Sequence, residues 1–237
     1  MTEARFPARP LLGASAIAMA VGFNVPYALL VSSFDYPDIL RRPAGEALTA
    51  FRAGGAELIW TWYGFGVAAL ALAPLAVALS LTPQRIATRP GLAVGAAIIG
   101  ALAGATQAMG LFRWVFVVPG LAATYADPAA SAAARNAAAR TFDVLNAYGG
   151  VAIGEHLGQL LTALFVAMVA ALQAQERQPA SAGIGAASAA AIGIGTGEGL
   201  ALALGQSGEA FSLFTIVGFL GLALWLAATG IAHLRSR

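Results

Sequence analysis

Long apolar runs, separated by short polar segments, dominate the hydrophobic pattern of the chain. Six of these runs reach the length of about 20 residues that a helix needs to cross roughly 30 Å of hydrocarbon. They occupy residues 11–33, 56–81, 91–118, 143–173, 180–204 and 211–233. The pattern predicts an all-α integral membrane bundle of six transmembrane helices, which we expect to form a single domain over residues 1–237.

Two connections between the apolar runs are longer than the others, residues 34–55 and 120–142. Each is expected to contain a short helix at the membrane interface. In the first, Leu48 and Phe51 would face the interface. In the second, Asp127 followed by a proline is typical of a helix start, because the carboxylate accepts free amides and proline lacks one. This second helix is expected to lead straight into the fourth run.

The distribution of arginine predicts the orientation in the membrane. An even number of spans puts both termini on one side, where the arginines are Arg5, Arg9, Arg85, Arg89, Arg177, Arg235 and Arg237. The opposite side carries Arg41, Arg42, Arg52, Arg135 and Arg140. Because basic residues are more frequent in cytoplasmic loops, seven against five predicts that both termini are cytoplasmic.

Composition excludes several kinds of site. Hydrophobic residues make up 59% of the chain and charged residues 10%, far from the balance of a soluble domain. There is no cysteine, so neither a disulfide nor a thiolate site is expected. There is also no lysine, which excludes a retinal-type Schiff base. With two histidines at different depths and no basic run, we expect no metal site and no nucleic-acid partner.

Glycine spacing indicates how the helices pack. Glycines recur every four residues in the third and fourth runs, at Gly100, Gly104, Gly150, Gly154 and Gly158. Such strips let another helix approach closely, whether within the bundle, in a membrane-protein partner or in a second copy of the chain. In the fifth run, glycines alternate with other residues from 193 to 199, a pattern that favours a bend or break.

Two ionisable residues, Glu155 and His156, lie side by side within the fourth run. Such groups are costly in hydrocarbon and therefore indicate a functional site. At helical spacing, Tyr148, Glu155, Gln159 and Thr162 would share one face. His156 would be turned about 100° away from Glu155, so we expect the two side chains to have different neighbours.

Alternating helix directions would bring several polar residues to the same half of the bilayer as Glu155. We therefore predict a polar pocket in the outer half that binds a small ligand, a lipid headgroup or a proton, as part of a transporter-like or sensory protein. Glu155 would accept the proton or cation, and His156 would form a hydrogen bond or ligate. The candidate ligand-binding residues are Glu155, His156, Arg113, Gln159, Glu198, Gln107, Trp60, Tyr63 and Asn24.

Each of these residues also has a purely structural explanation. Trp60 and Tyr63 are of the type that lines the membrane–water interface, together with Trp62 and Trp114. Arg113 could instead form a buried ion pair with Glu155 that fixes the packing of two helices.

Two other classes of function are compatible with the sequence. One is an accessory subunit of a larger membrane complex, with the glycine strips facing partner helices and His156 ligating a haem or chlorophyll-type pigment. The glycines near His156 would then leave room for the macrocycle. The other is an intramembrane enzyme with Glu155 and His156 as acid and base, which requires both side chains in one cavity.

Four segments resemble an uncharacterised family of bacterial polytopic membrane proteins, domain of unknown function 4386. They are Tyr36-Pro-Asp-Ile-Leu40, Leu111-Phe-Arg-Trp114, Tyr125-Ala-Asp-Pro128 and Tyr148-Gly-Gly-Val-Ala-Ile-Gly-Glu-His-Leu-Gly158. The resemblance covers nearly the whole chain, and the Gly-Glu-His-Leu-Gly stretch is its most specific part. It implies a six-helix protein of the bacterial inner membrane and assigns no role to any residue.

Overall fold

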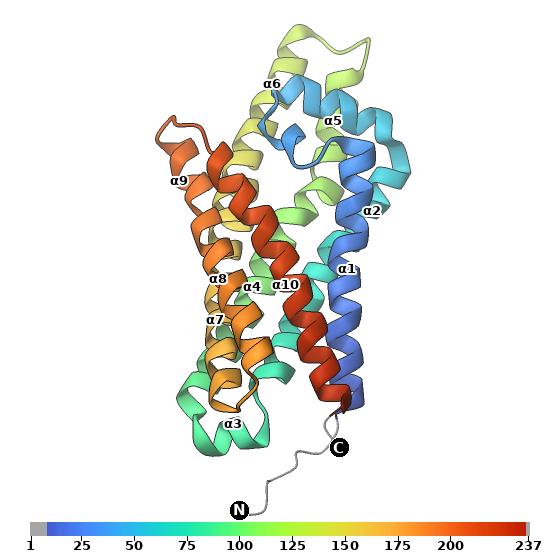
Figure 1. The fold of residues 1–237 in the computed structure, drawn as a ribbon. Coiled ribbons are helices and arrows are strands. Elements are labelled where there is room, and N and C mark those ends of the chain that lie inside the picture. Colours follow the sequence, from blue (N-terminus) through green and yellow to red (C-terminus); the bar gives the residue numbers. More distant parts are fainter. Residues whose placement is uncertain (1–8, 236–237) are drawn as a thin grey trace, which may run out of the picture.

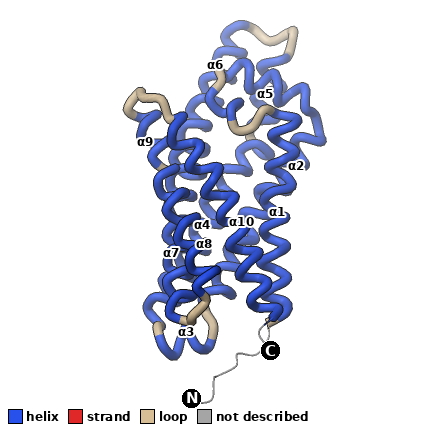
Figure 2. Tube along the Cα trace, in the orientation of Figure 1, coloured by secondary structure: helices blue, strands red, loops and turns tan. Residues whose placement is uncertain are grey.

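The computed structural model describes residues 9–235, and this part of the chain contains helices and short connections without any strand (Figure 2). Six helices are long and apolar enough to cross a membrane, and they overlap the six predicted runs. The protein is therefore an all-α polytopic membrane protein, as the hydrophobic pattern predicts. Arg5 and Arg237, which contribute to the predicted orientation, lie outside the described residues.

Several of the membrane-crossing helices are composed of consecutive segments. In chain order these are α1 (Pro10–Phe34), α2 (Ala44–Ser80), α4 (Pro90–Phe116) with α5 (Val118–Ala126), α6 (Ala132–Leu145) with η2 (Asn146–Leu157) and α7 (Gly158–Gln175), α8 (Pro179–Gly195) with α9 (Gly197–Ala203), and α10 (Glu209–Arg235). Two short helices lie in the connections, η1 (Asp38–Arg41) and α3 (Pro83–Thr88).

The described ends of the chain and α3 lie at one end of the bundle, here called the proximal end, and α5, α6 and α9 lie toward the opposite, distal end (Figure 1). At the proximal end α10 meets α1, where a Cβ atom on Gly13 would lie 2.7 Å from the carbonyl oxygen of Gly230. The proximal end is also held by Arg85, whose guanidinium contacts Glu176 at 2.7 Å. Toward the distal end, α1 and α10 diverge (Figure 1).

The connection from α1 to α2 folds back onto the bundle. As predicted, this connection contains a helix, which begins at Ala44 directly after Pro43. The helix kinks at Gly55, whose φ of 59° is in the left-handed region, and continues to Ser80. The expectation that Leu48 and Phe51 face the interface is wrong, because they are 0% and 2% exposed. Phe51 instead packs on aromatic rings of α1 and α4, which bury it more completely than an interface would.

The connection from α5 to α6 begins its helix later than the sequence predicts. Asp127 accepts a hydrogen bond from the backbone of Ala129 within a turn, and α6 starts at Ala132 with Ser131 as its cap. The prediction that Asp127 caps this helix is therefore wrong. Ser131 is the cap, because its hydroxyl accepts a hydrogen bond from the backbone amide of Ala134. As predicted, α6 continues directly into the fourth membrane-crossing helix.

Both glycine strips are used inside the bundle, where they face other helices of the same chain. Added Cβ atoms at Gly100 and Gly104 would meet α2 at 2.5 and 2.8 Å. Gly154 lies directly against the backbone of Gly110 on α4, where a Cβ would come within 3.1 Å of its Cα. The strips therefore fix close contacts of α4 with α2 and with η2.

Candidate functional site

A cavity of about 530 Å³ lies in the distal half of the bundle, with walls contributed by α1, η1, α2, α4, η2, α7, α9 and α10. Six of the nine predicted site residues line it: Asn24, Gln107, Arg113, Glu155, Gln159 and Glu198. His156, Trp60 and Tyr63 do not. The alternating helix directions thus bring together most of the polar residues that the sequence singles out.

Glu155 reaches the cavity from a π-helix, Asn146–Leu157. A π-helix has more residues per turn than an α-helix, and π-helical turns occur frequently at functional sites. The wider turn changes which residues share a face, so Tyr148 is 69% exposed on the outside of the bundle while Glu155 and Gln159 line the cavity. The predicted alignment of Tyr148 with Glu155 is therefore wrong, because it assumed α-helical spacing throughout.

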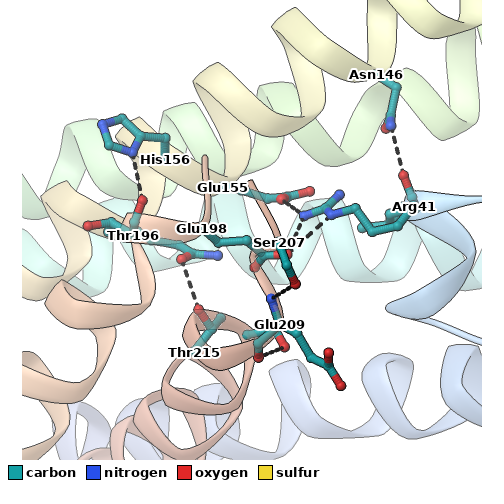
Figure 3. A network of polar contacts seen from close by, with 12 residues as sticks. Arg41, Asn146, Glu155, His156, Thr196, Glu198, Ser207, Glu209 and Thr215 are labelled. Atoms are coloured by element: carbon teal, nitrogen blue, oxygen red, sulfur yellow. Dashed lines mark hydrogen bonds and ion pairs between the residues drawn. The ribbon is translucent and has the colours of Figure 1, made fainter. Parts of the chain in front are cut away.

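Arg41 is the cation that pairs with Glu155 (Figure 3). Its Nη2 lies 2.5 Å from Glu155 Oε2 and 3.0 Å from Glu198 Oε1, and its Nε lies 3.2 Å from the same Glu198 oxygen. Burial opposes the charge of Arg41, but the two carboxylates outweigh it and raise the pKa of the guanidinium above its usual value. One arginine from the α1–α2 connection thus links the π-helix to α9.

Arg41 is not among the site residues predicted from the sequence, where it counts only as a loop charge that indicates orientation. A signal was present, since Arg41 directly follows Ile39 and Leu40, two apolar residues flanked on both sides by charged ones. Both are buried, 3% and 6% exposed, and they hold η1 against the bundle. That burial directs the arginine inward.

Arg113 does not pair directly with Glu155, so the predicted alternative of an Arg113–Glu155 bridge is wrong. Its guanidinium donates to the carbonyl oxygen of Gly110 and, at 3.0 Å, to Asn146 Oδ1. Asn146 in turn donates to the backbone oxygen of Leu40 at 3.0 Å. Arg113 therefore anchors η1 to α4, because neutral acceptors already occupy its terminal nitrogens.

His156 points away from the cavity (Figure 3). Its Nδ1 lies 2.9 Å from the carbonyl oxygen of Thr196, at the junction of α8 and α9. The glycine-rich fifth helix does break there, as predicted, and the break places this carbonyl within reach of His156. Glu155 and His156 thus have separate neighbours, as their angular separation predicts.

The glycines near His156 offer no room for a macrocycle. A Cβ on Gly158 would lie 2.9 Å from the Gln107 side chain, and one on Gly150 would lie 2.5 Å from Arg113. On the other side of the ring, a Cβ on Gly199 would lie 3.2 Å from His156 itself. The space beside these glycines is therefore already filled, so the glycines do not provide room for a haem or chlorophyll ring.

The four aromatic residues for which the sequence also suggested a place at the membrane interface, three tryptophans and one tyrosine, fall into two groups. Trp60 and Tyr63 are 71% and 40% exposed on the outer face of the bundle, so they lie outside the cavity. Trp62 and Trp114 are fully buried in the cavity wall, stacked with ring centroids 4.9 Å apart. Sequence reasoning missed these two because all four aromatics occur near the ends of apolar runs.

The ring of Tyr36 packs between Tyr27 and Trp62 in the wall of the cavity. Its ring centroid lies 5.6 Å from that of Tyr27 and 5.4 Å from that of Trp62. Burial, and then the nearby negative charge of Glu155, raise the pKa of the Tyr36 phenol well above its usual value of 10.0. The phenol therefore stays protonated and can donate a hydrogen bond at any ordinary pH.

Below the charged groups the cavity becomes less polar. Gln159 lies 3.4 Å from the Thr215 hydroxyl, and Gln107 donates to Thr162 at 2.5 Å. Beyond them the wall consists of apolar side chains of α10: Ile216, Phe219, Leu220, Leu222, Ala223 and Leu226. Among residues 9–235, no group of three or more acidic, histidine or cysteine side chains is placed to hold a metal ion.

Comparison with known proteins identifies the family. The model of the family described as Domain of unknown function (DUF4386) matches residues 11–230. The match covers most of the chain, so the protein belongs to this family, as the four sequence segments indicate. No curated protein and no solved structure shows a significant match.

Proposed function

We propose that the protein binds a small amphipathic molecule in the distal cavity and acts as a transporter-like or sensory component of the membrane. The observation that supports this most directly is the change in character along one cavity. Charged groups of η1, η2 and α9 line its distal part, and apolar side chains, mainly of α1, α2 and α10, line much of the remainder. A molecule with a polar head and an apolar body matches that division.

The volume of the cavity also fits a small molecule. At about 530 Å³ it falls within the roughly 300–1,000 Å³ range typical of ligand pockets. It is far larger than a proton or a single water molecule requires, so the proton alone is the weaker of the predicted ligands.

Access from the membrane is supported by the divergence of α1 and α10. Leu220 of α10 lines the cavity and is 54% exposed, so the wall at this position also faces outward. Phe23, Asn24 and Tyr27 of α1 also line the cavity. An amphipathic molecule in the lipid could therefore enter sideways between the two helices.

The two other predicted classes of function have less support. An acid–base pair requires Glu155 and His156 in one cavity, whereas their side chains have separate neighbours. Pigment ligation through His156 loses the support of its neighbouring glycines, since side chains of α4 fill the space beside Gly150 and Gly158.

Filling the cavity tests the proposal. Ala223 lines the apolar part, so Ala223→Phe should block it. Leu224→Phe is the matched control, because Leu224 lies next in the chain, does not line the cavity and is 64% exposed. Native mass spectrometry of the purified proteins should find a retained small molecule in the wild type and in Leu224→Phe, and none in Ala223→Phe. Equal retention by all three proteins would sink the proposal.

A further inference from the structure

The charges that line the cavity have an excess of negative sign. Four carboxylates and two guanidinium groups face it, from Asp38, Glu155, Glu198, Glu209, Arg41 and Arg113. Of the two arginines, Arg113 donates through its terminal nitrogens to neutral acceptors, the carbonyl of Gly110 and the amide of Asn146, while its Nε is buried without a partner. With four carboxylates against two guanidinium groups, the charge of the lining repels an anionic ligand and attracts a cationic one.

Arg41 already occupies the place that a cationic ligand would take. Its guanidinium is shared between Glu155 and Glu198, at 2.5 and 3.0 Å. It comes from η1, a four-residue helix in a connection, and not from a membrane-crossing helix. The second oxygen of Glu155, Oε1, is buried without a hydrogen-bond partner, so this carboxylate retains capacity for another donor.

Aromatic rings line the cavity beside these carboxylates. They belong to Phe23, Tyr27, Tyr36, Trp62 and Phe65. Tyr36 contacts Trp62 edge to face, with centroids 5.4 Å apart, and Phe23 contacts Phe65 in the same way at 6.3 Å, while Trp62 and Phe65 are stacked. Aromatic faces attract organic cations and provide apolar surface for their substituents. An inorganic ion would use the carboxylates but not the rings.

We propose that the ligand is a lipophilic organic cation whose charged centre replaces Arg41 as the counterion of Glu155 and Glu198. This inference rests on the proposed function of the same cavity and adds the chemical class of the ligand. Arg41 then acts as a built-in competitor, which holds the two carboxylates paired until the ligand arrives. The apolar substituents of the cation pack against the aromatic rings and the apolar wall of α10.

Two hydrophobic ions of nearly equal size and opposite charge test the sign of the ligand. Equilibrium binding of radiolabelled tetraphenylphosphonium and tetraphenylborate to the full-length protein in lipid nanodiscs would be measured, with Ala223→Phe defining binding outside the cavity. Triphenylphosphine oxide serves as the neutral probe. We expect the cation to bind at least about ten-fold more tightly than either of the others. Tighter or equal binding of the borate or the neutral probe in the cavity would overturn the inference and leave the proposed function standing.

Substitutions then test the exchange with Arg41. Glu198→Gln should weaken binding of tetraphenylphosphonium by about ten-fold, with Glu57→Gln, an exposed carboxyl outside the cavity, as its control. Arg41→Gln should strengthen it by a similar factor, because the competitor is gone, and Arg41→Lys should leave it close to the wild type.

Arg42→Gln is the control for Arg41→Gln, since Arg42 pairs with Asp35 at the surface and does not line the cavity. The two variants should unfold at the same temperature. If Arg41→Gln then binds tetraphenylphosphonium more weakly than Arg42→Gln does, the proposal that the cation replaces Arg41 is overturned. If none of the three probes binds in a way that Ala223→Phe abolishes, the inference falls. The retained molecule in native mass spectrometry then decides separately whether the proposed function falls with it.

Discussion

The charged residues at the centre of the site are individually costly to bury, and one arginine stabilises two carboxylates. Glu155 and Glu198 would each be costly to bury alone, and Arg41 offsets both through one guanidinium. The side chains remain 16–29% exposed, so solvent or a ligand in the cavity reaches them. In a partly exposed ion pair, a ligand can replace one partner, as a binding site requires. A fully buried ion pair would resist that exchange.

The pH dependence of stability should report on Tyr36. Because burial and the charge of Glu155 raise its pKa in the folded state, the unfolded chain loses the phenolic proton first as the pH rises. Stability from this group is complete below about pH 10 and falls above it, by up to about 1.4 kcal/mol per pH unit. Tyr36→Phe removes that dependence.

Chemical unfolding followed by tryptophan fluorescence between pH 8 and 11.5, an experimental range chosen around the usual tyrosine pKa of about 10, would measure the difference. The stability of Tyr36→Phe should decline less steeply than that of the wild type only above about pH 10. Two parallel curves over the whole range would show that Tyr36 ionises as readily in the folded protein as in the unfolded chain.

Helices could be predicted where the spacing of apolar residues and glycines is regular, and could not where the helical turn itself changes. The apolar runs mark the six membrane-crossing helices, and the alternating glycines mark the break at Thr196. The π-helix left no such mark, so the face of Tyr148 was assigned wrongly. The role of Arg41 could not be predicted because its partners, Glu155 and Glu198, lie 114 and 157 residues away in the sequence. Only the packing of η1 brings Arg41 close to them.

The contact between η2 and α4 should depend on a glycine of each helix. A Cβ on Gly110 would lie 2.7 Å from the backbone Cα of Gly154, and backbone cannot move aside as a flexible side chain can. We expect Gly110→Ala to destabilise the protein by about 1–3 kcal/mol and to displace Glu155 from Arg41. Gly64→Ala on α2 is the control, because nothing lies within 4 Å of its added Cβ.

Thermal unfolding in detergent would measure both glycine variants. Gly64→Ala should be neutral or up to about 1 kcal/mol more stable, since alanine favours a helix. If Gly110→Ala were as stable as Gly64→Ala, the close approach of η2 to α4 would not be required for the fold.

At the scale of the whole molecule, the bundle is closed at one end and open at the other. The proximal end is tied by the Gly13–Gly230 contact and by the Arg85–Glu176 pair. The distal end carries the connections whose side chains enter the cavity. Which compartment the cavity faces therefore depends on the orientation in the membrane, for which the arginine distribution predicts cytoplasmic termini.

The absence of cysteine makes that orientation testable with single substitutions. Gln206→Cys places an exposed thiol in the distal α9–α10 connection, and Ala87→Cys places one in α3 at the proximal end. With cytoplasmic termini, a membrane-impermeant maleimide added to intact cells should label Gln206→Cys, and should label Ala87→Cys only after the membrane is opened. The reverse pattern would put the cavity on the cytoplasmic side, because both thiols lie on rigidly opposite ends of one bundle (Figure 1). A ligand that enters from the lipid would then come from the inner leaflet.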